Sequence, residues 1–518
     1  MSGSQCELLN VYQLLEASSQ KRPDKEAVYD RTRRLTYAEL LQETDRIAAA
    51  LDAKGIKQGD RVGVSLPNWH ETVAIYFAVA KIGAILVPFN TKYRLHEAQH
   101  IIKDSGIKLL FVSAEFDEQV GVESVAPLVQ GVVSVRFDKE GIISLESLIE
   151  QAGNHVPALV EIDPVRDVFC VLYTSGTTGF PKGAMLTHRG MVWSGRTIGE
   201  SIHSSPEDVY LIPAPLFHIF GMGINLFAAI SMQSKIVLMD VYKAKEALEL
   251  IQQEKVTVHH AVPTMYILEL NHPDFASYDL SSLRTGVVGG APCPAETIRA
   301  IKEKMRMNIC NSFGMSEIGS LTITAYQDTE KNIHETIGKA IPGAEAKIVN
   351  DSREPVPFGE VGEIACRSFG VMKGYYNNPE QTSQVIDQDG WFYTGDLGVM
   401  QPDGYIRFVG RKKEMIIRGG YNIYPGEIEE ILYQHPKVLQ AAVIGLPDPV
   451  MGEIACAVIK LKADEQSSNE EMLAYVKQHL ADYKVPKQVV FTESLPATAS
   501  GKIQKLKLKE AILKQASH

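Results

Sequence analysis

A short loop rich in hydroxyl-bearing residues and glycine ends in a single lysine. Its candidate ligand contacts are Thr174, Ser175, Gly176, Thr177, Thr178, Gly179 and Lys182. Glycine lets backbone N–H groups approach a ligand, and N–H donors, hydroxyls and one cation together suit a polyphosphate. The loop is not a Walker A sequence, because Pro181 precedes the lysine and Gly183 follows it. Pro181 also disfavours a helix directly after the loop. Such a loop is equally typical of a surface turn, so the rest of the chain decides its interpretation.

Acidic residues, a histidine and a second lysine stand in short motifs further along the chain. The motifs are Pro215–Gly221, Asn311–Glu317, Tyr393–Asp396 and Pro496–Ile503. A polyphosphate brings a divalent cation that prefers oxygen ligands, which makes Glu317 a candidate Mg²⁺ ligand. A short carboxylate after a turn, such as Asp396, can accept both hydroxyls of a ribose. Taken singly, His218 is also typical of a hydrogen-bonded core residue, and Lys502 of a solvated basic tail.

Length and charge limit the possible classes of protein. A chain of 518 residues is too long for one hydrophobic core, and a net charge of −11 disfavours nucleic-acid binding. Six cysteines without CxxC spacing are typical of reduced thiols and indicate neither a disulfide framework nor a zinc site. No secretory signal or membrane-spanning run is found in the sequence. We expect a soluble cytoplasmic protein with no integral membrane segment and no nucleic-acid partner; a homodimer is compatible with the sequence.

Short apolar runs alternate with helical patterns over roughly the first 400 residues. The predicted strands are Val62–Leu66, Ile85–Pro88, Leu109–Val112, Val168–Tyr173, Lys235–Met239, Val256–Ala261 and Thr285–Val288, and the predicted helices include Glu71–Ile82, Ala244–Glu254 and Ala295–Met305. Such alternation predicts βαβ units and largely parallel sheets. From about Ile337, short strands separated by Gly, Pro and Asp predict a β-rich subdomain.

A second change of pattern follows the charged segment Arg411–Glu414. Beyond it we expect a helix, two strands and a second helix, at Pro425–Gln434, Val438–Gly445, Ile454–Lys462 and Asn469–His479. The predicted class is α/β. A large N-terminal domain (1–412) combines βαβ-type sheets with the β-rich subdomain, and a small, mobile α+β domain (413–518) follows.

These motifs, in this order, resemble those of the adenylate-forming (ANL) ligases, and nearly the whole chain is similar to their acyl-CoA synthetase branch. The resemblance implies that the loop ending in Lys182 binds the β- and γ-phosphates of ATP. It further implies that Glu317 holds Mg²⁺ and that the adenine and α-phosphate are bound by Gly289, Gly290, Ala291, Asn311, Ser312, Phe313, Gly314 and Ser316. Phe313 replaces the usual tyrosine. Ser312 stands where aryl-acid ligases often have glycine.

The resemblance also assigns roles to more distant residues. It implies that Asp396 binds the ribose, that Arg411 assists with ribose and phosphate, and that Lys502 is the catalytic lysine. His218 matches the histidine beside the carboxylate pocket, so Lys502, His218 and Glu317 are the catalytic candidates.

The family's small domain rotates between its two half-reactions. The pivot corresponds to Lys413, and the rotation withdraws Lys502 and presents Gly419 and Gly420 to a pantetheine arm. A hinge needs only a few residues that absorb the dihedral change.

The implied reaction activates a carboxylic acid with ATP and Mg²⁺ to an acyl-adenylate and transfers the acyl group to coenzyme A. The apolar segment after His218 contains no acid to pair with an α-ammonium, which disfavours amino-acid substrates. We expect a medium- or long-chain fatty acid. The alternatives are an aryl acid, a carrier-protein pantetheine in place of coenzyme A, and, less favoured, a luciferase-like oxygenase or a non-catalytic nucleotide- or acyl-binding protein.

Overall fold

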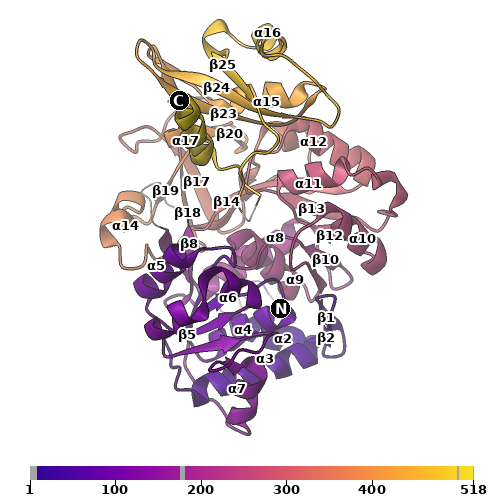
Figure 1. Cartoon of the computed structure of the whole chain (residues 1–518), viewed down its shortest axis with the longest axis vertical. Helices are drawn as coiled ribbons and strands as arrows, with labels where there is room; N and C mark the ends of the chain where they lie inside the picture. The colour runs from indigo at the N-terminus through magenta and orange to yellow at the C-terminus, as the bar shows by residue number, and fades with distance from the viewer. Residues whose placement is uncertain (1–8, 175–180, 499–500, 517–518) are drawn as a thin grey trace.

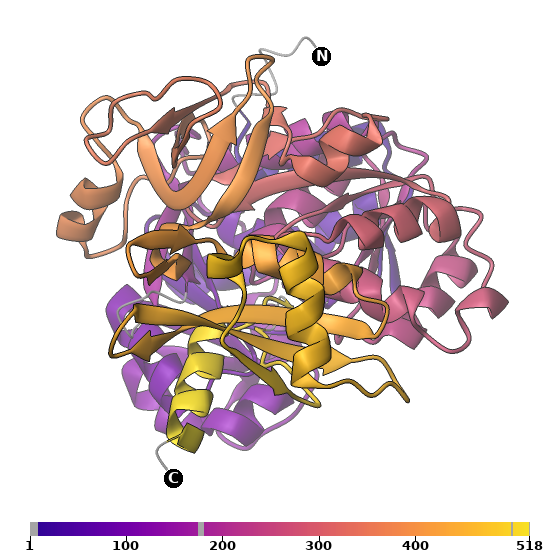
Figure 2. The ribbon, with the colours of Figure 1, turned by 90° about the horizontal axis from the view of Figure 1, so that it is seen from above.

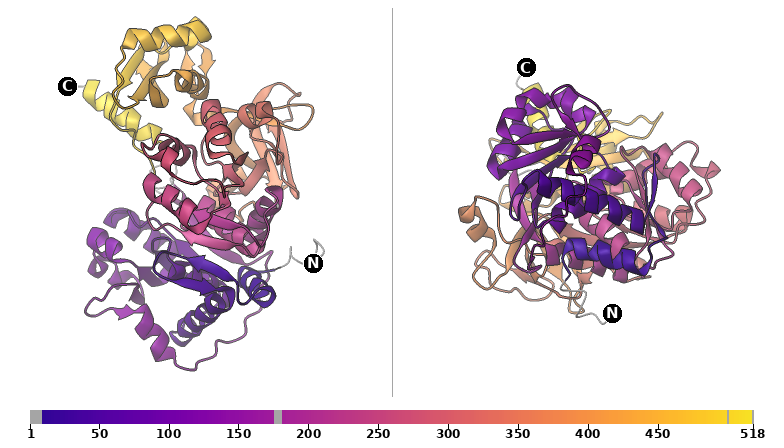
Figure 3. Two further views of the ribbon diagram at one scale, coloured as in Figure 1. Left: turned by 90° about the vertical axis from the view of Figure 1, so that its right-hand side faces the viewer. Right: turned by 90° about the horizontal axis from the view of Figure 1, so that it is seen from below.

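The computed structural model describes residues 9–174, 181–498 and 501–516 of the chain (Figure 1). Two large sheets and a smaller antiparallel sheet form the N-terminal part. The C-terminal part, drawn in yellow, lies at one end of the molecule. In the view from above it lies over the N-terminal part (Figure 2). The side view shows the first helices of the chain at the opposite end (Figure 3). Within the described residues, no helix is long and apolar enough to cross a bilayer.

The first large sheet has seven strands. In spatial order they are β7 (Ile143–Ser144), β6 (Gly131–Ser134), β5 (Ile107–Val112), β3 (Arg61–Ser65), β4 (Ile85–Pro88), β8 (Val168–Thr174) and β9 (Lys182–Thr187). All neighbours are parallel except β8 and β9, which form an antiparallel hairpin. Buried parallel strands read as continuous apolar runs, and β5 follows this rule except at Lys108. A strand rather than a helix begins after Pro181, as the proline predicts.

The second large sheet has nine strands. In spatial order they are β16 (Lys339–Ala340), β15 (Gly319–Ile323), β14 (Asn308–Met315), β13 (Thr285–Val288), β12 (Val258–His259), β10 (Val209–Ile212), β11 (Lys235–Leu238), β1 (Glu26–Tyr29) and β2 (Arg34–Thr36). The strands from β14 to β1 are parallel, and β2, β15 and β16 are antiparallel additions. Ligands of such sheets bind beyond the carboxyl ends of the parallel strands, where Gly289 follows β13.

The predicted β-rich subdomain is an antiparallel sheet of β17 (Ala344–Val349), β18 (Val361–Ser368), β19 (Phe392–Met400) and β20 (Ile406–Arg411). In its register, Asp396 of β19 stands opposite Arg411 of β20. This pairing brings a carboxylate and a guanidinium together.

The C-terminal sheet consists of β22 (Tyr421–Ile423), β21 (Ile416–Arg418), β24 (Gly452–Leu461), β23 (Val438–Asp448) and β25 (Gln488–Phe491). Alternate residues of a strand face opposite sides of a sheet. Ala441 and Val443 therefore pack with helices α15 (Pro425–Gln434) and α16 (Asn469–His479), whereas Ala442 and Ile444 pack with α17 (Lys505–Ala516). The basic tail predicted from the sequence is thus the amphipathic helix α17.

The remaining helices are α2 (Val11–Lys21), α3 (Tyr37–Ala53), α4 (His70–Lys81), α5 (Leu95–Ser105), α6 (Ala114–Val120), α7 (Leu145–Ala152), α8 (His188–Ser201), α9 (Ala228–Ser231), α10 (Ala244–Glu254), α11 (Pro263–Leu270), α12 (Ala295–Ala300), α13 (Glu330–Glu335) and α14 (Pro379–Val385). Two segments wind more widely, as π-helix: Phe220–Phe227 and Ile301–Met305. The helix predicted over Ala295–Met305 is therefore α12 continued by π-helix. The other π-helix was not predicted, because its apolar residues give no helical stripe.

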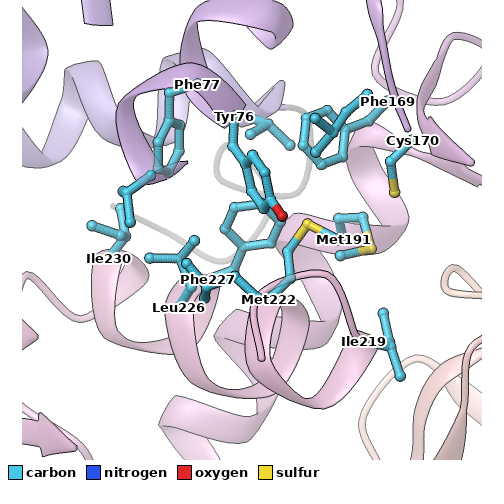
Figure 4. Packing of buried hydrophobic residues seen from close by; sticks show 14 of the residues in the cluster. Tyr76, Phe77, Phe169, Cys170, Met191, Ile219, Met222, Leu226, Phe227 and Ile230 are labelled. Atoms are coloured by element: carbon cyan, nitrogen blue, oxygen red, sulfur yellow. The ribbon is translucent and has the colours of Figure 1, made fainter. Parts of the chain in front are cut away.

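The main core lies where both large sheets meet the helices between them. Figure 4 shows side chains of α4, β8, α8, α9 and the π-helix Phe220–Phe227 converging there. The Phe227 ring is fully buried, with ring centres 5.8 Å from Phe77 and 5.9 Å from Phe169. The five cysteines in the described part of the chain are free and buried, in agreement with the reduced thiols expected from their spacing.

A charged cluster also joins the two large sheets. Asp30, which follows β1, accepts hydrogen bonds from His70 at the start of α4 and from Arg136 after β6. Arg136 also donates to Glu71 at 2.8 Å. The Arg136 guanidinium pairs with both carboxylates, so the cluster is an ion network that fixes the two sheets relative to each other.

Phe227→Ala should lower the free energy of unfolding by about 3–5 kcal/mol, because it removes a buried ring and leaves a cavity. Urea unfolding followed by fluorescence measures this effect. Phe358→Ala is the matched control, since Phe358 is 62% exposed and its loss should change stability by no more than about 0.5 kcal/mol. Similar shifts for both variants would contradict the assignment of the core.

Candidate active site

The β8–β9 hairpin carries the two described ends of the predicted phosphate loop. Thr174 and Lys182 are paired across its strands; Ser175, Gly176, Thr177, Thr178 and Gly179 lie outside the described residues. The Lys182 ammonium lies 5.5 Å from the ring centre of Tyr375, and Ala184 forms a β-bridge with the same residue. These contacts direct the lysine toward the segment that carries Glu317.

Glu317 lies in the turn between β14 and β15 and is 7% exposed. Its carboxylate accepts a hydrogen bond from the Tyr375 hydroxyl at 3.0 Å. Burial raises the pKa of Glu317, while Tyr375, Arg411 and Lys182 oppose that rise. A carboxylate that faces two cations and retains free lone pairs fits a site for a polyphosphate and its divalent cation. The preceding hydroxyl residue, Ser316, is half-buried in the same turn.

Asp396 and Arg411 form the second polar group of the site. The Arg411 Nε lies 3.5 Å from the Asp396 carboxylate, which is nearly buried. Burial raises the pKa of Asp396, and Arg411 and then Lys502 counteract it. Both cations are therefore close to this carboxylate, and they come from different parts of the molecule.

Lys502 reaches this group from a tight loop of the C-terminal part. The loop is closed by a β-bridge between Ala497 and Ile503 and by the Gly501 N–H, which donates to the Thr498 carbonyl. Burial, and then repulsion by Arg411, lower the pKa of Lys502 to about 8. The neighbouring Lys505 is paired with Glu414 and Glu429, at 3.4 and 2.7 Å, so Lys502 is the lysine of this loop that faces the site.

The charge of Lys502 also affects the pKa of His218. Its Nδ1 accepts the Phe220 N–H at 3.2 Å, so in the neutral ring the proton is on Nε2. Burial, together with Lys502, lowers the pKa of His218 to about 4. The ring is therefore neutral near pH 7 and can donate one hydrogen bond from Nε2.

Glycines allow close backbone approach beside the histidine. A Cβ on Gly289 would lie 2.9 Å from the Ser312 carbonyl and 3.4 Å from the Phe220 ring, and one on Gly314 would lie 2.1 Å from the Gly319 carbonyl. Strands β13 and β14 and the π-helix Phe220–Phe227 thus meet at this point. Next to Gly289, Gly290 is exposed and Ala291 is half-buried.

The other side chains predicted to bind adenine already have protein partners. Asn311 donates to the Thr336 carbonyl at 2.9 Å and Ser312 donates to the Thr322 carbonyl at 2.8 Å. The Phe313 ring lies 6.1 Å from that of Phe408. Asn311 and Ser312 therefore hold the sheet, and any role of these three residues toward a nucleotide stays a prediction.

The predicted pivot lies beside these groups, two residues after Arg411, and its charge opposes the rise in the pKa of Asp396. The predicted pantetheine loop lies in the C-terminal sheet. Lys413 is exposed, in the single turn Lys412–Glu414 between β20 and β21. Gly419 and Gly420 form the turn of the β21–β22 hairpin with positive φ angles. The Gly419 N–H donates to the carbonyl of Met451, within the C-terminal part.

The comparisons with known proteins agree with this arrangement. Residues 15–376 match the family described as "AMP-binding enzyme", and residues 427–502 match the "AMP-binding enzyme C-terminal domain". The chain belongs to this family. The predicted membership of the adenylate-forming superfamily and the predicted α/β class are confirmed.

Relatives within the AMP-binding family extend over nearly the whole chain. The "Putative acyl-CoA synthetase YngI" of Bacillus subtilis (strain 168) is 40% identical over 96% of both chains. The "Medium-chain acyl-CoA ligase ACSF2, mitochondrial" of Macaca fascicularis is 36% identical, over 96% of this chain and 86% of its own. The solved anthranilate CoA ligase AuaEII in complex with anthranoyl-AMP superimposes with a TM-score of 0.92 at 30% identity, covering 99% and 98% of the two chains. The prediction of an AMP-forming acyl-CoA synthetase is confirmed by these relatives.

Three residues near the site were not found by sequence reasoning. Tyr375 binds Glu317, Glu414 adds negative charge beside Lys502, and Thr264 contacts Gly501. Tyr375 and Thr264 lie in no motif identified from the sequence. Glu414 was assigned only to the charged segment Arg411–Glu414 between the two predicted domains.

We expect kcat/KM for ATP in adenylate formation to fall as the pH rises through about 8, because Lys502 then loses its positive charge. The measurement is pyrophosphate release without coenzyme A across roughly pH 6.5–9.5, since kcat/KM reports groups of the free enzyme. Lys502→Arg keeps its charge throughout this range and should remove the alkaline fall. An alkaline fall that persists in this variant would show that another group titrates.

Proposed function

We propose that this protein is an acyl-CoA synthetase that uses Lys502 only in the first of two half-reactions, on a medium- or long-chain fatty acid. One observation carries the proposal. Lys502 belongs to the C-terminal part, yet its charge acts on Asp396 and His218 of the N-terminal part. This arrangement brings a mobile cation to the nucleotide and acid sites together, as adenylation requires.

In the first half-reaction the substrate carboxylate attacks the α-phosphorus of ATP, and the bond to pyrophosphate breaks. The chemistry needs alignment and neutralisation of negative charge more than acid or base groups. Lys182 faces the β- and γ-phosphates, Asp396 holds the ribose hydroxyls, and Lys502 stabilises charge that develops at the α-phosphate. Glu317 would hold Mg²⁺, which would further neutralise the phosphates.

Neutral His218 positions the acid. Its Nε2–H donates to one oxygen of the substrate carboxylate and leaves the other oxygen free to attack. A protonated imidazolium would bind the carboxylate as an ion pair and lower its nucleophilicity. Burial beside Lys502 prevents this by lowering the pKa of the ring.

In the second half-reaction the sulfur of coenzyme A attacks the acyl carbonyl carbon, the thiol proton leaves and AMP departs. We assign the pivot to Lys413, at the boundary of the domains 1–412 and 413–518, and the pantetheine contact to Gly419 and Gly420. The turn at Lys412–Glu414 is short, and Lys412 and Lys413 are exposed, which supports a hinge there. A cytoplasmic location and a homodimer stay predictions.

The apolar residues after His218 support a fatty acid. Phe220, Met222 and Ile224 are buried, and Figure 4 shows Met222 and Met191 close to each other. Beyond the histidine this segment carries no charged side chain. The medium-chain specificity in the name of one relative agrees with this assignment, whereas the anthranilate ligase supports the aryl-acid alternative.

Lys502→Ala should lower the rate of adenylate formation by about 10²–10³, because it removes a charge that acts in the transition state. Conversion of chemically prepared acyl-AMP to acyl-CoA should stay close to the wild-type rate. Lys507→Ala, an exposed lysine of α17, is the matched control. Equal losses of Lys502→Ala in both half-reactions would contradict its proposed role.

The acid is tested by kcat/KM over straight-chain acids from acetate upward, with benzoate and cinnamate as aryl competitors. Each methylene buried in an apolar site contributes about 0.8 kcal/mol, or roughly fourfold per carbon. We expect this rise until the chain fills the pocket, and a very poor rate with acetate. A flat profile, or a preference for the aryl acids, would overturn the fatty-acid assignment but not the ligase assignment.

A further inference from the structure

The loop that carries Lys502 is held by a hydrogen bond from the N-terminal part. The Thr264 hydroxyl, in the first turn of α11, donates to the Gly501 carbonyl at 2.8 Å. Gly501 directly precedes the catalytic lysine. A shift of this carbonyl therefore moves the backbone from which the Lys502 side chain extends.

An apolar contact accompanies the hydrogen bond. Gly501 has a φ of +81°, and a Cβ at this position would lie 2.8 Å from Val262 and 3.6 Å from the Thr264 hydroxyl. Val262 also lies 3.4 Å from the position of a Cβ on Gly290. The short segment Val262–Thr264 thus contacts both the lysine loop and the adenine-binding segment.

Helix α11 is anchored firmly enough to act as a support. At its far end, Glu269 is fully buried and pairs with His259 at 3.0 Å. The Tyr242 hydroxyl donates to the Met265 carbonyl at 2.9 Å, and the Tyr266 hydroxyl donates to the His259 carbonyl at 2.6 Å. A helix packed and hydrogen-bonded in this way moves little, so it holds the Thr264 hydroxyl in a fixed position.

We propose that Thr264 is a positioning residue for the adenylation half-reaction. By binding the Gly501 carbonyl it orients the Lys502 side chain toward the α-phosphate. The inference rests on the proposed function, in which Lys502 acts in the first half-reaction and withdraws for the second. The hydrogen bond joins the two parts of the molecule, so it exists only while the C-terminal part occupies this orientation. Thr264 acts through the loop and has no role once the loop has left.

The test measures the two half-reactions separately in Thr264→Val, which keeps the shape of the side chain but removes the donor. Loss of one neutral hydrogen bond should lower kcat for adenylate formation by about three- to tenfold. The KM for ATP and for the acid should change little. Transfer from prepared acyl-AMP to coenzyme A should be unchanged or faster, because the orientation in which Gly501 contacts Thr264 is then less favoured.

Two controls separate docking from a general effect on the fold. Thr264→Ser retains the hydroxyl and should restore adenylation to within about twofold of the wild type. Leu268→Ala, on the exposed face of the same helix, should leave both half-reactions unchanged. Gly501→Ala disturbs the same contact from the C-terminal part. If the two residues act through this contact, the fold-loss in the adenylation rate of the double variant with Thr264→Val should be smaller than the product of the two single losses.

The outcomes are distinguishable. Equal loss in both half-reactions, failure of Thr264→Ser to restore adenylation, or an unaltered Thr264→Val would overturn the docking role while leaving the ligase assignment intact. A wild-type protein that forms no acyl-adenylate would overturn the proposed function and this inference with it. Loss confined to adenylation, together with rescue by serine, would establish it.

Discussion

The site depends on keeping two nearly buried carboxylates charged. Burial alone raises the pKa of both Glu317 and Asp396, and an unpaired buried charge is strongly destabilising. Four cations oppose this effect: Lys182 from β9, Arg411 from β20, Lys413 from the turn after β20, and Lys502 from a loop of the C-terminal part. No single segment therefore forms the site, and its electrostatics are complete only when the three parts are assembled.

The same cations also repel one another when the C-terminal part brings Lys502 to the site. Arg411 repels Lys502, which contributes to the lowered pKa of the lysine. A polyphosphate bound between these groups carries the opposite charge and relieves the repulsion, so nucleotide binding and closure favour each other. Contacts that carry no charge, such as those of Gly501 with Val262 and Thr264, hold the loop without adding to the repulsion.

The acid side of the site depends on backbone geometry. The π-helix Phe220–Phe227 winds more widely than an α-helix, and such segments are frequent at functional sites. A Cβ on Gly221 would lie 2.1 Å from the Pro215 carbonyl, so glycine is required where the chain turns back beside His218. The Asn225 amide donates to the Phe220 carbonyl at 2.9 Å and satisfies a backbone group inside the core.

Local sequence pattern was sufficient for most elements and for the motifs, since periodicity and turn residues act within a few positions. Strand β4 and helices α10 and α15 have their predicted bounds. The π-helix was not predictable, because an apolar run has the same composition in either winding. The sequence by itself determined the family, the fold class and the candidate charged residues. Only the tertiary structure decided that Thr264 meets Gly501 across 237 residues, because such contacts arise from how packed sheets and helices meet in space.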